Sequence, residues 1–209
     1  LTLTDAIKTV RARGRYMQEA VPAGTGAMAA VVGADIKEIE NACAKASQGQ
    51  ICAPANINSP SQVVIAGNTE AIDRCSELLK ARGAKRVIKL NVSAPFHCAL
   101  MKPAQERLAV DLAITGFFEL KTPLVTNVDA VAIEKAEEAR DSLVRQVSSP
   151  VRWLESVELL ISRGVDTFVE VGPGKVLTGL MRQISREVKN FNVEDVTSLK
   201  NASANLGKS

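Results

Sequence analysis

The chain has 209 residues, of which 46% are hydrophobic and 23% are charged, and its net charge is +3. This composition supports a buried core in one or two domains and argues against disorder. The small charge, the seven aromatic residues and the lack of any apolar run of membrane-spanning length exclude obvious nucleic-acid and membrane partners.

The N-terminal residues 3–21 show the apolar spacing of an amphipathic helix, with Thr2 and Asp5 placed as a capping box. The chain starts without methionine, in what reads as the middle of an element, and carries no signal peptide. We therefore expect a fragment of a longer, cytoplasmic protein.

The cysteines indicate neither zinc nor a disulfide framework. They form no Cys-x-x-Cys pair, and the chain has no secretory signal. Reduced thiols are expected at Cys43, Cys52, Cys75 and Cys98.

The region 26–92 predicts a regular alternation of strands and helices. Strands are expected at 26–33, 50–57, 62–67 and 86–92, and helices at 34–47 and 68–83. This β-α-β-β-α-β order is that of a ferredoxin-like split unit.

After residue 92 the pattern changes to longer helices. Helices are expected at 99–114, 134–147, 150–163 and 173–185, strands at 123–128, 167–172 and 196–199, and a frayed tail at 200–209. The alternation predicts an α/β layer with a largely parallel sheet. We expect a large α/β domain formed by residues 1–25 and 93–209, with residues 26–92 inserted as a smaller domain.

Arg13 is the first candidate functional residue. On a helical wheel it falls near the middle of the apolar face, which is formed by Leu3, Ala6, Val10, Met17 and Val21. A buried guanidinium is costly unless paired, and its planar fork suits a carboxylate or a phosphate. An internal ion pair, or a side chain that reaches out to solvent, is the structural alternative.

His97, the only histidine, lies in "NVSAPFHCALMKPA" (91–104) between a predicted strand and a predicted helix. The carboxyl ends of strands gather ligands in α/β folds, and a neutral imidazole is the usual general base near pH 7. The alternative is a packed side chain without a catalytic role. Cys98 is a poor candidate nucleophile, because the side chains of adjacent residues diverge.

Two polar segments are more simply explained as turns. "EVGPGKVLTGL" (170–180) lacks the glycine spacing of a phosphate loop, and no Ser or Thr follows its lysine. Asn56 and Asn58 end a predicted strand and, on their own, are turn residues.

Four blocks in order resemble the malonyl-CoA:acyl-carrier-protein transacylases of bacterial fatty acid synthesis, with the likeness running from residue 1 to about 185. They are "VRARGRYMQEAVPAGTGAMAAVVG", "NINSPSQVVIAG", "VSAPFHCALMKPA" and "FVEVGPGKVLTGL". The resemblance implies an α/β-hydrolase-like acyltransferase domain with an inserted ferredoxin-like subdomain. It also implies ping-pong transfer of a malonyl group from malonyl-CoA to the phosphopantetheine thiol of acyl carrier protein, without a cofactor or a metal.

The resemblance also assigns roles to individual residues. His97 matches the catalytic base, Gln146 the residue whose backbone carbonyl orients it, and Arg13 the binder of the malonyl carboxylate. Asn58, Phe96 and Met17 are assigned to substrate binding, with Phe96 favouring malonyl over methylmalonyl.

One motif of the family is absent. The Gly-His-Ser-Leu-Gly elbow with the nucleophilic serine would precede Leu1, so we expect the chain alone to be inactive. Two alternatives stay open: a non-enzymatic module that binds an anion or a protein, and an acyltransferase segment of a polyketide synthase.

Overall fold

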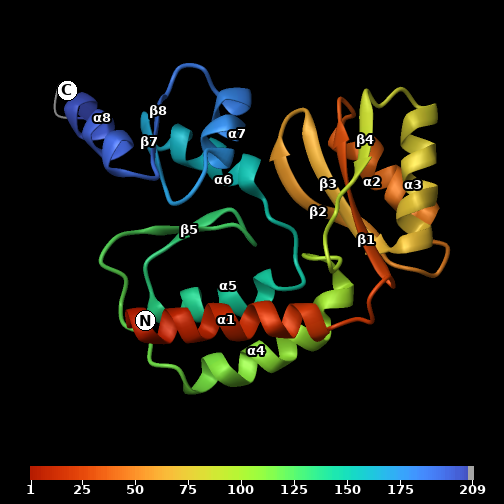
Figure 1. Cartoon of the computed structure of the whole chain (residues 1–209), viewed down its shortest axis with the longest axis horizontal. Coiled ribbons are helices and arrows are strands. Elements are labelled where there is room, and N and C mark those ends of the chain that lie inside the picture. The colour runs from red at the N-terminus through yellow and green to blue at the C-terminus, as the bar shows by residue number, and fades with distance from the viewer. Residues whose placement is uncertain (207–209) are drawn as a thin grey trace. The chain divides into compact units, whose positions relative to one another are not determined.

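A four-stranded antiparallel sheet with two helices on one face dominates the first part of the computed structural model (Figure 1). Its elements are β1 (Gly26–Val32), α2 (Ile36–Ser47), β2 (Cys52–Ser59), β3 (Gln62–Asn68), α3 (Thr69–Ala81) and β4 (Arg86–Lys89). The strand order β2-β3-β1-β4 is the ferredoxin-like arrangement, which confirms the predicted β-α-β-β-α-β unit.

The two faces of this sheet are buried by different neighbours, because alternate side chains of a strand point to opposite faces. Ala27, Ala29 and Val31 of β1 pack with Ile39 of α2 and other apolar residues of α2 and α3. Met28 and Ala30 join the opposite cluster, which includes Cys98 and also contacts Phe96. The second face of the sheet therefore supports the segment around the lone histidine.

A second core lies among helices. Its elements are α1 (Leu3–Glu19), a short 3₁₀ helix (Ala99–Met101), α4 (Lys102–Ile114) and α5 (Ala136–Gln146). Tyr16 and Met17 of α1 pack against Leu108 and Leu112 of α4, with Val147 just beyond α5. The C-terminal half of α1 is therefore the half that is anchored.

The apolar face of α1 was expected to be buried along its whole length, but in the N-terminal half of the helix it is exposed. Leu3, Ile7 and Val10 are 78%, 61% and 68% exposed in the part of the chain that the structure describes. The spacing correctly predicted a helix with one apolar face. It could not show which part of that face is covered, since coverage depends on the neighbouring elements.

The structure describes residues 1–206 and divides the chain into two units, Leu1–Ser156 and Val157–Ser209. The first unit also contains the antiparallel hairpin of β5 (Leu124–Thr126) and β6 (Val131–Ile133), and α6 (Trp153–Ser162) runs across the division. The second contains β7 (Thr167–Val171), α7 (Val176–Ile184), β8 (Lys189–Val193) and α8 (Val196–Leu206). The proposed insertion of residues 26–92 as a separate domain stays a prediction.

Several sequence predictions in the second half were wrong. Residues 196–199 are the first turn of α8, and the tail is helical as far as Leu206; its last residues, 207–209, lie outside the described part. Ser198 N donates to the Asp195 carboxylate at 2.7 Å, a side-chain cap that starts this helix. Strands β6 and β8 were not predicted.

The prediction of a largely parallel sheet was also wrong for the described strands. Only β7 and β8 pair as parallel neighbours, and every other paired strand is antiparallel. Among the described strands β7 pairs with β8 alone, and its positions are exposed or half-buried instead of fully buried. None of the described helices combines the length and the apolar character needed to cross a bilayer.

Gly26 allows the close approach of the segment that carries the histidine. A Cβ added at Gly26 would lie 2.2 Å from Pro95 Cγ, and Pro95 is fully buried two residues before His97. We expect Gly26→Ala to lower the free energy of unfolding by roughly 1–3 kcal/mol, the usual cost of overpacking. Thermal or denaturant unfolding measures this loss.

Gly179→Ala is the matched control for that variant. Gly179 lies inside α7 with no atom near its added Cβ, so alanine there should be neutral or slightly stabilising. Equal unfolding midpoints for Gly26→Ala and the unmodified protein would contradict the importance of the contact between Gly26 and Pro95.

Candidate functional site

The loop that carries His97 links β4 to the 3₁₀ helix and holds its backbone in an unusual conformation. His97 has φ 59°, in the left-handed region that non-glycine residues adopt at a cost of roughly 1–3 kcal/mol. Its neighbours fix the loop: Pro95 is buried, and the Cys98 thiol donates to the Pro95 carbonyl at 3.2 Å. Such strain, held by packing on both sides, is typical of functional sites.

The imidazole of His97 is oriented by a backbone carbonyl. Nδ1 lies 3.1 Å from the carbonyl oxygen of Gln146. Since a carbonyl only accepts, Nδ1 carries the proton and Nε2 keeps a free lone pair. Burial lowers the pKa of His97 below its ordinary 6.5, and the nearby charge of Arg13 lowers it further, against the opposing effect of the Gln146 carbonyl. His97 is therefore neutral at pH 7 and can accept a proton through Nε2.

Gln146 is itself held in place by the turn that follows α5. Its side-chain amide donates to the carbonyl oxygens of Ser149 and Pro150, at 3.0 and 3.2 Å. Val151, the next residue, exchanges two backbone hydrogen bonds of 2.8 Å with Ala55 and Ile57 of strand β2. The carbonyl that orients the histidine is thereby tied to the edge of the sheet.

Sequence reasoning missed the contribution of Ser149. Its backbone carbonyl also favours the protonated form of His97 and so opposes the lowering of the pKa. Nothing in the sequence could have indicated this, because every residue type carries the same backbone carbonyl. The role assigned to Gln146 came from the family resemblance alone.

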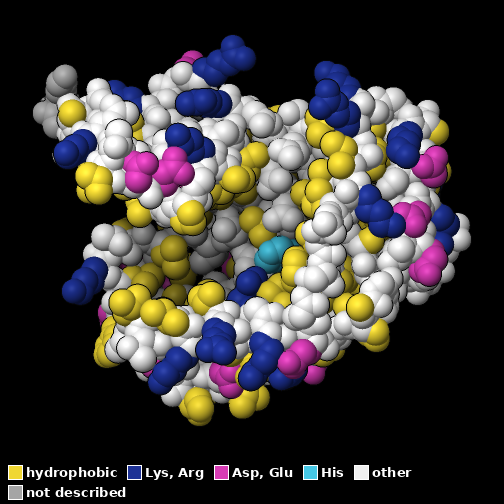
Figure 2. Space-filling model, in the orientation of Figure 1, with side chains coloured by type: hydrophobic (Ala, Val, Ile, Leu, Met, Phe, Trp, Pro, Cys, Tyr) yellow, Lys and Arg dark blue, Asp and Glu magenta, His cyan; other side chains and the backbone are white. Residues whose placement is uncertain are grey.

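Arg13 lies in the middle of α1 with its side chain half-buried. Within residues 1–206 its guanidinium has no hydrogen bond or ion pair. Burial lowers its pKa, and its charge lowers that of His97, so the two groups lie within electrostatic reach. A half-buried cation without a partner is suited to bind an anion beside the histidine. Figure 2 shows that histidine, in cyan, reaching the surface.

The remaining predicted substrate residues lie at three different positions. Asn58 sits where the register between β2 and β3 shifts, and such bulges redirect side chains. Phe96 packs against both the helical core and the outer face of the sheet. Met17, one turn after Arg13, is only 3% exposed and packs in the helical core. Contact of these three residues with a substrate stays a prediction.

Cys98 is not an activated nucleophile. Burial raises the pKa of its thiol to about 11, and its hydrogen bond goes to the Pro95 carbonyl. A reactive cysteine needs the opposite shift. Among residues 1–206, no serine, threonine or cysteine side chain hydrogen-bonds to His97.

The turn before α7 is occupied by the chain's own carboxylate. Glu170 accepts from the backbone N–H groups of Leu177 and Thr178, at 3.0 and 2.7 Å. A phosphate bound there would have to displace this carboxylate. The arrangement supports the tight-turn interpretation of residues 170–180.

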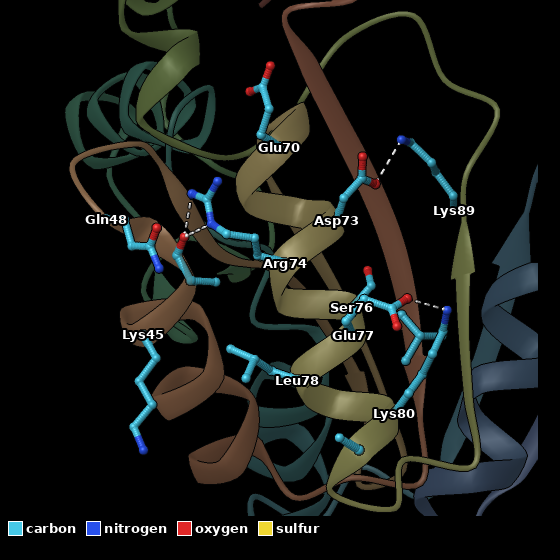
Figure 3. Close-up of a pocket in the computed structure, with 13 residues that line it drawn as sticks. Lys45, Gln48, Glu70, Asp73, Arg74, Ser76, Glu77, Leu78, Lys80 and Lys89 are labelled. Carbon is cyan, nitrogen blue, oxygen red and sulfur yellow. Dashed lines mark hydrogen bonds and ion pairs between the residues drawn. The ribbon is translucent and has the colours of Figure 1, made fainter.

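A groove between α2, α3 and β4 is a weaker candidate site (Figure 3). Lys89 pairs with Asp73 and Lys80 with Glu77, both at 2.9 Å. Arg74 turns toward the end of α2, where it donates to the Ala46 carbonyl. These polar groups are already paired with one another, unlike the free guanidinium beside the histidine.

Comparison with known proteins identifies relatives of the whole described chain. Residues 1–206 match the acyl transferase domain family. The malonyl CoA-acyl carrier protein transacylase of Escherichia coli strain K12 is 52% identical over 184 residues, which are 88% of this chain and 60% of the relative. The chain therefore spans about three fifths of that relative's length.

Solved structures agree closely with this one. An acyl carrier protein S-malonyltransferase from Vibrio cholerae superposes with a TM-score of 0.95 at 48% identity, covering 97% of this chain and 66% of its own. A malonyl-transacylase solved in complex with a type II polyketide synthase acyl carrier protein has a TM-score of 0.95 and 48% identity, covering 98% and 66%. The acyltransferase fold that the sequence predicted is confirmed.

Proposed function

Because this chain belongs to the acyl transferase domain family, we propose that its protein transfers a malonyl group from malonyl-CoA to the phosphopantetheine thiol of an acyl carrier protein. The observation that carries the proposal is that a neutral, oriented His97 lies within electrostatic reach of the free, half-buried guanidinium of Arg13. The first group moves protons, and the second binds a carboxylate.

His97 acts as base and acid in turn. Its Nε2 takes the proton of a serine hydroxyl as the serine oxygen attacks the thioester carbonyl. The carbon–sulfur bond then breaks, the imidazolium returns the proton to the CoA sulfur, and a malonyl ester remains on the serine. The phosphopantetheine thiol next gives its proton to His97 as its sulfur attacks that ester, the carbon–oxygen bond breaks, and the imidazolium returns the proton to the serine oxygen. The serine in this proposal lies outside the 209 residues.

The Gln146 carbonyl supports both steps. It fixes the tautomer that leaves Nε2 free, and its oxygen stabilises the imidazolium that forms when the proton arrives. A backbone carbonyl thus takes the place of the aspartate of a catalytic triad.

Arg13 supplies the selectivity for a dicarboxylic acyl group. The free carboxylate of a malonyl thioester can accept two parallel hydrogen bonds from the guanidinium. An acetyl thioester would leave that charge half-buried and unpaired, and binding sites reject such ligands strongly. Asn58, Phe96 and Met17 are proposed to line the acyl pocket around this pair.

Intact mass before and after exposure to malonyl-CoA tests the proposal. We expect the protein that contains this chain to gain one malonyl group and to pass it to an acyl carrier protein, and the 209 residues alone to gain none. Carrier proteins of fatty acid and polyketide synthesis, compared side by side, identify the acceptor. If the longer protein gained no malonyl group, the module that only binds an anion or a protein would be favoured. A malonyl adduct on the 209 residues alone would refute the prediction that the nucleophilic serine lies outside them.

A further inference from the structure

Three buried cysteines from three separate elements meet inside the ferredoxin-like unit. Cys43 lies on α2, Cys75 on α3, and Cys52 begins β2. Their sulfur atoms all lie within 4.8 Å of one another, and the Cys43 and Cys75 sulfurs are 3.8 Å apart. The candidate acyl-transfer site uses none of these residues.

The spacing of the three sulfurs suits a single atom bound at their centre. A triangle with edges of 3.8 Å has its centre about 2.2 Å from each sulfur, close to the roughly 2.3 Å of a zinc–thiolate bond. The edges that involve Cys52 reach at most 4.8 Å, so a shift of the Cys52 sulfur by about 1 Å closes the triangle. Cys52 is at the start of an edge strand, where such a shift is easiest.

Sulfur is the only donor that this cluster offers. In the described part of the chain, no histidine or carboxylate belongs to it, and its surroundings are apolar residues such as Ile39, Ile72 and Leu79. Arg74 holds the two helices in register, because its guanidinium on α3 donates to the Ala46 carbonyl near the end of α2 at 2.6 Å (Figure 3). The site is therefore buried and enclosed by packed side chains, with three soft ligands.

The thiols are also hydrogen-bonded to one another. Hydrogen bonds with Cys52 and Cys75, together with burial, raise the pKa of Cys43. Hydrogen bonds from Cys43 and Cys52 lower the pKa of Cys75, and the charge of Arg82 adds to this effect.

We propose that Cys43, Cys52 and Cys75 form a binding site for a trivalent, thiophilic ion of the arsenite class, held as a tris-thiolate. Arsenous acid, As(OH)₃, condenses with three thiols to give As(SR)₃ and three waters. Three As–O and three S–H bonds break, three As–S and three O–H bonds form, and arsenic stays trivalent. No oxidant or reductant is needed.

The net charge of the tris-thiolate complex distinguishes among the soft ions that could bind. Three thiolates give a neutral complex with a trivalent ion, a singly negative one with zinc or cadmium and a doubly negative one with copper(I). A neutral complex needs no counter-charge inside the apolar cluster, whereas an anionic one would depend on the charges of Arg74 and Arg82, which reach Cys52 and Cys75. Zinc also prefers a fourth ligand, and the cluster does not supply one.

The test is intact mass under non-denaturing conditions, with stoichiometric arsenite and a phosphine reductant, since a thiol reductant would compete for arsenic. A tris-thiolate adds one arsenic and removes three hydrogens, whereas a two-thiol adduct retains an As–OH group. We expect the tris-thiolate mass on the unmodified protein and a melting temperature that rises with arsenite concentration.

Cys52→Ala is the test variant and Cys98→Ala the matched control, because Cys98 is the buried cysteine outside the cluster. Cys52→Ala should remove the tris-thiolate species, and Cys98→Ala should retain it. Circular dichroism of both variants is the control for folding. A missing adduct on the folded unmodified protein, or a tris-thiolate that survives Cys52→Ala, would overturn the proposal.

Discussion

Replacing His97 with asparagine is expected to slow malonyl transfer by roughly 10²- to 10⁴-fold, the usual contribution of a general base. Asparagine is chosen because it tolerates the left-handed backbone that His97 adopts at φ 59°, whereas alanine would add strain. Steady-state transfer from malonyl-CoA to an acyl carrier protein measures the loss. A rate within a few fold of normal would remove His97 from the mechanism.

The pH dependence separates a proton-transfer role from a structural one. The pKa of His97 lies below 6.5 because of burial, so the unmodified protein should lose kcat/KM on the acid side only below that value. His97→Asn should lack this acid limb.

Since the unfolded imidazole titrates near 6.5, the unfolded state binds more protons in this window, and stability falls as the pH drops through it. The asparagine variant should lose less stability over the same range.

Replacing Arg13 with alanine is expected to reduce the preference for malonyl over acetyl thioesters by roughly 10²- to 10⁴-fold, the value of two charge-assisted hydrogen bonds. Malonyl transfer should fall while acetyl transfer stays level or rises, because the unpaired charge that opposes acetyl is gone. The ratio of kcat/KM for the two thioesters measures the change. An equal loss for both would refute the carboxylate role.

Arg11→Ala is the matched control, since Arg11 is on the same helix but exposed. It should leave the ratio unchanged. Arg13→Lys should give a malonyl-to-acetyl ratio of kcat/KM between those of Arg13→Ala and the unmodified protein, because a lysine keeps the charge but loses the planar fork. Burial lowers the pKa of Arg13, so its charge costs stability in the folded chain, and Arg13→Ala should unfold at no lower temperature.

The candidate site could be predicted from the sequence only in part. His97 was found because it is the single histidine at a strand-to-helix junction, and Arg13 because it interrupts an apolar stripe. The hydrogen bond to the Gln146 carbonyl and the support from Val151 depend on backbone atoms that carry no sequence signature. The cysteine cluster escaped notice for a related reason: its members are far apart in the chain and lack Cys-x-x-Cys spacing.

Most local elements and the ferredoxin-like order follow from the amino-acid pattern alone, because the period of apolar residues distinguishes helices from strands and the turn residues mark their ends. Where that signal was weak it failed, as at residues 196–199, where a capped helix replaced the expected strand. The pairing of the strands, the half of α1 that is covered and the contacts between distant side chains are properties of the folded chain. Those outcomes depend on contacts between segments far apart in the chain, which periodicity within one segment does not record.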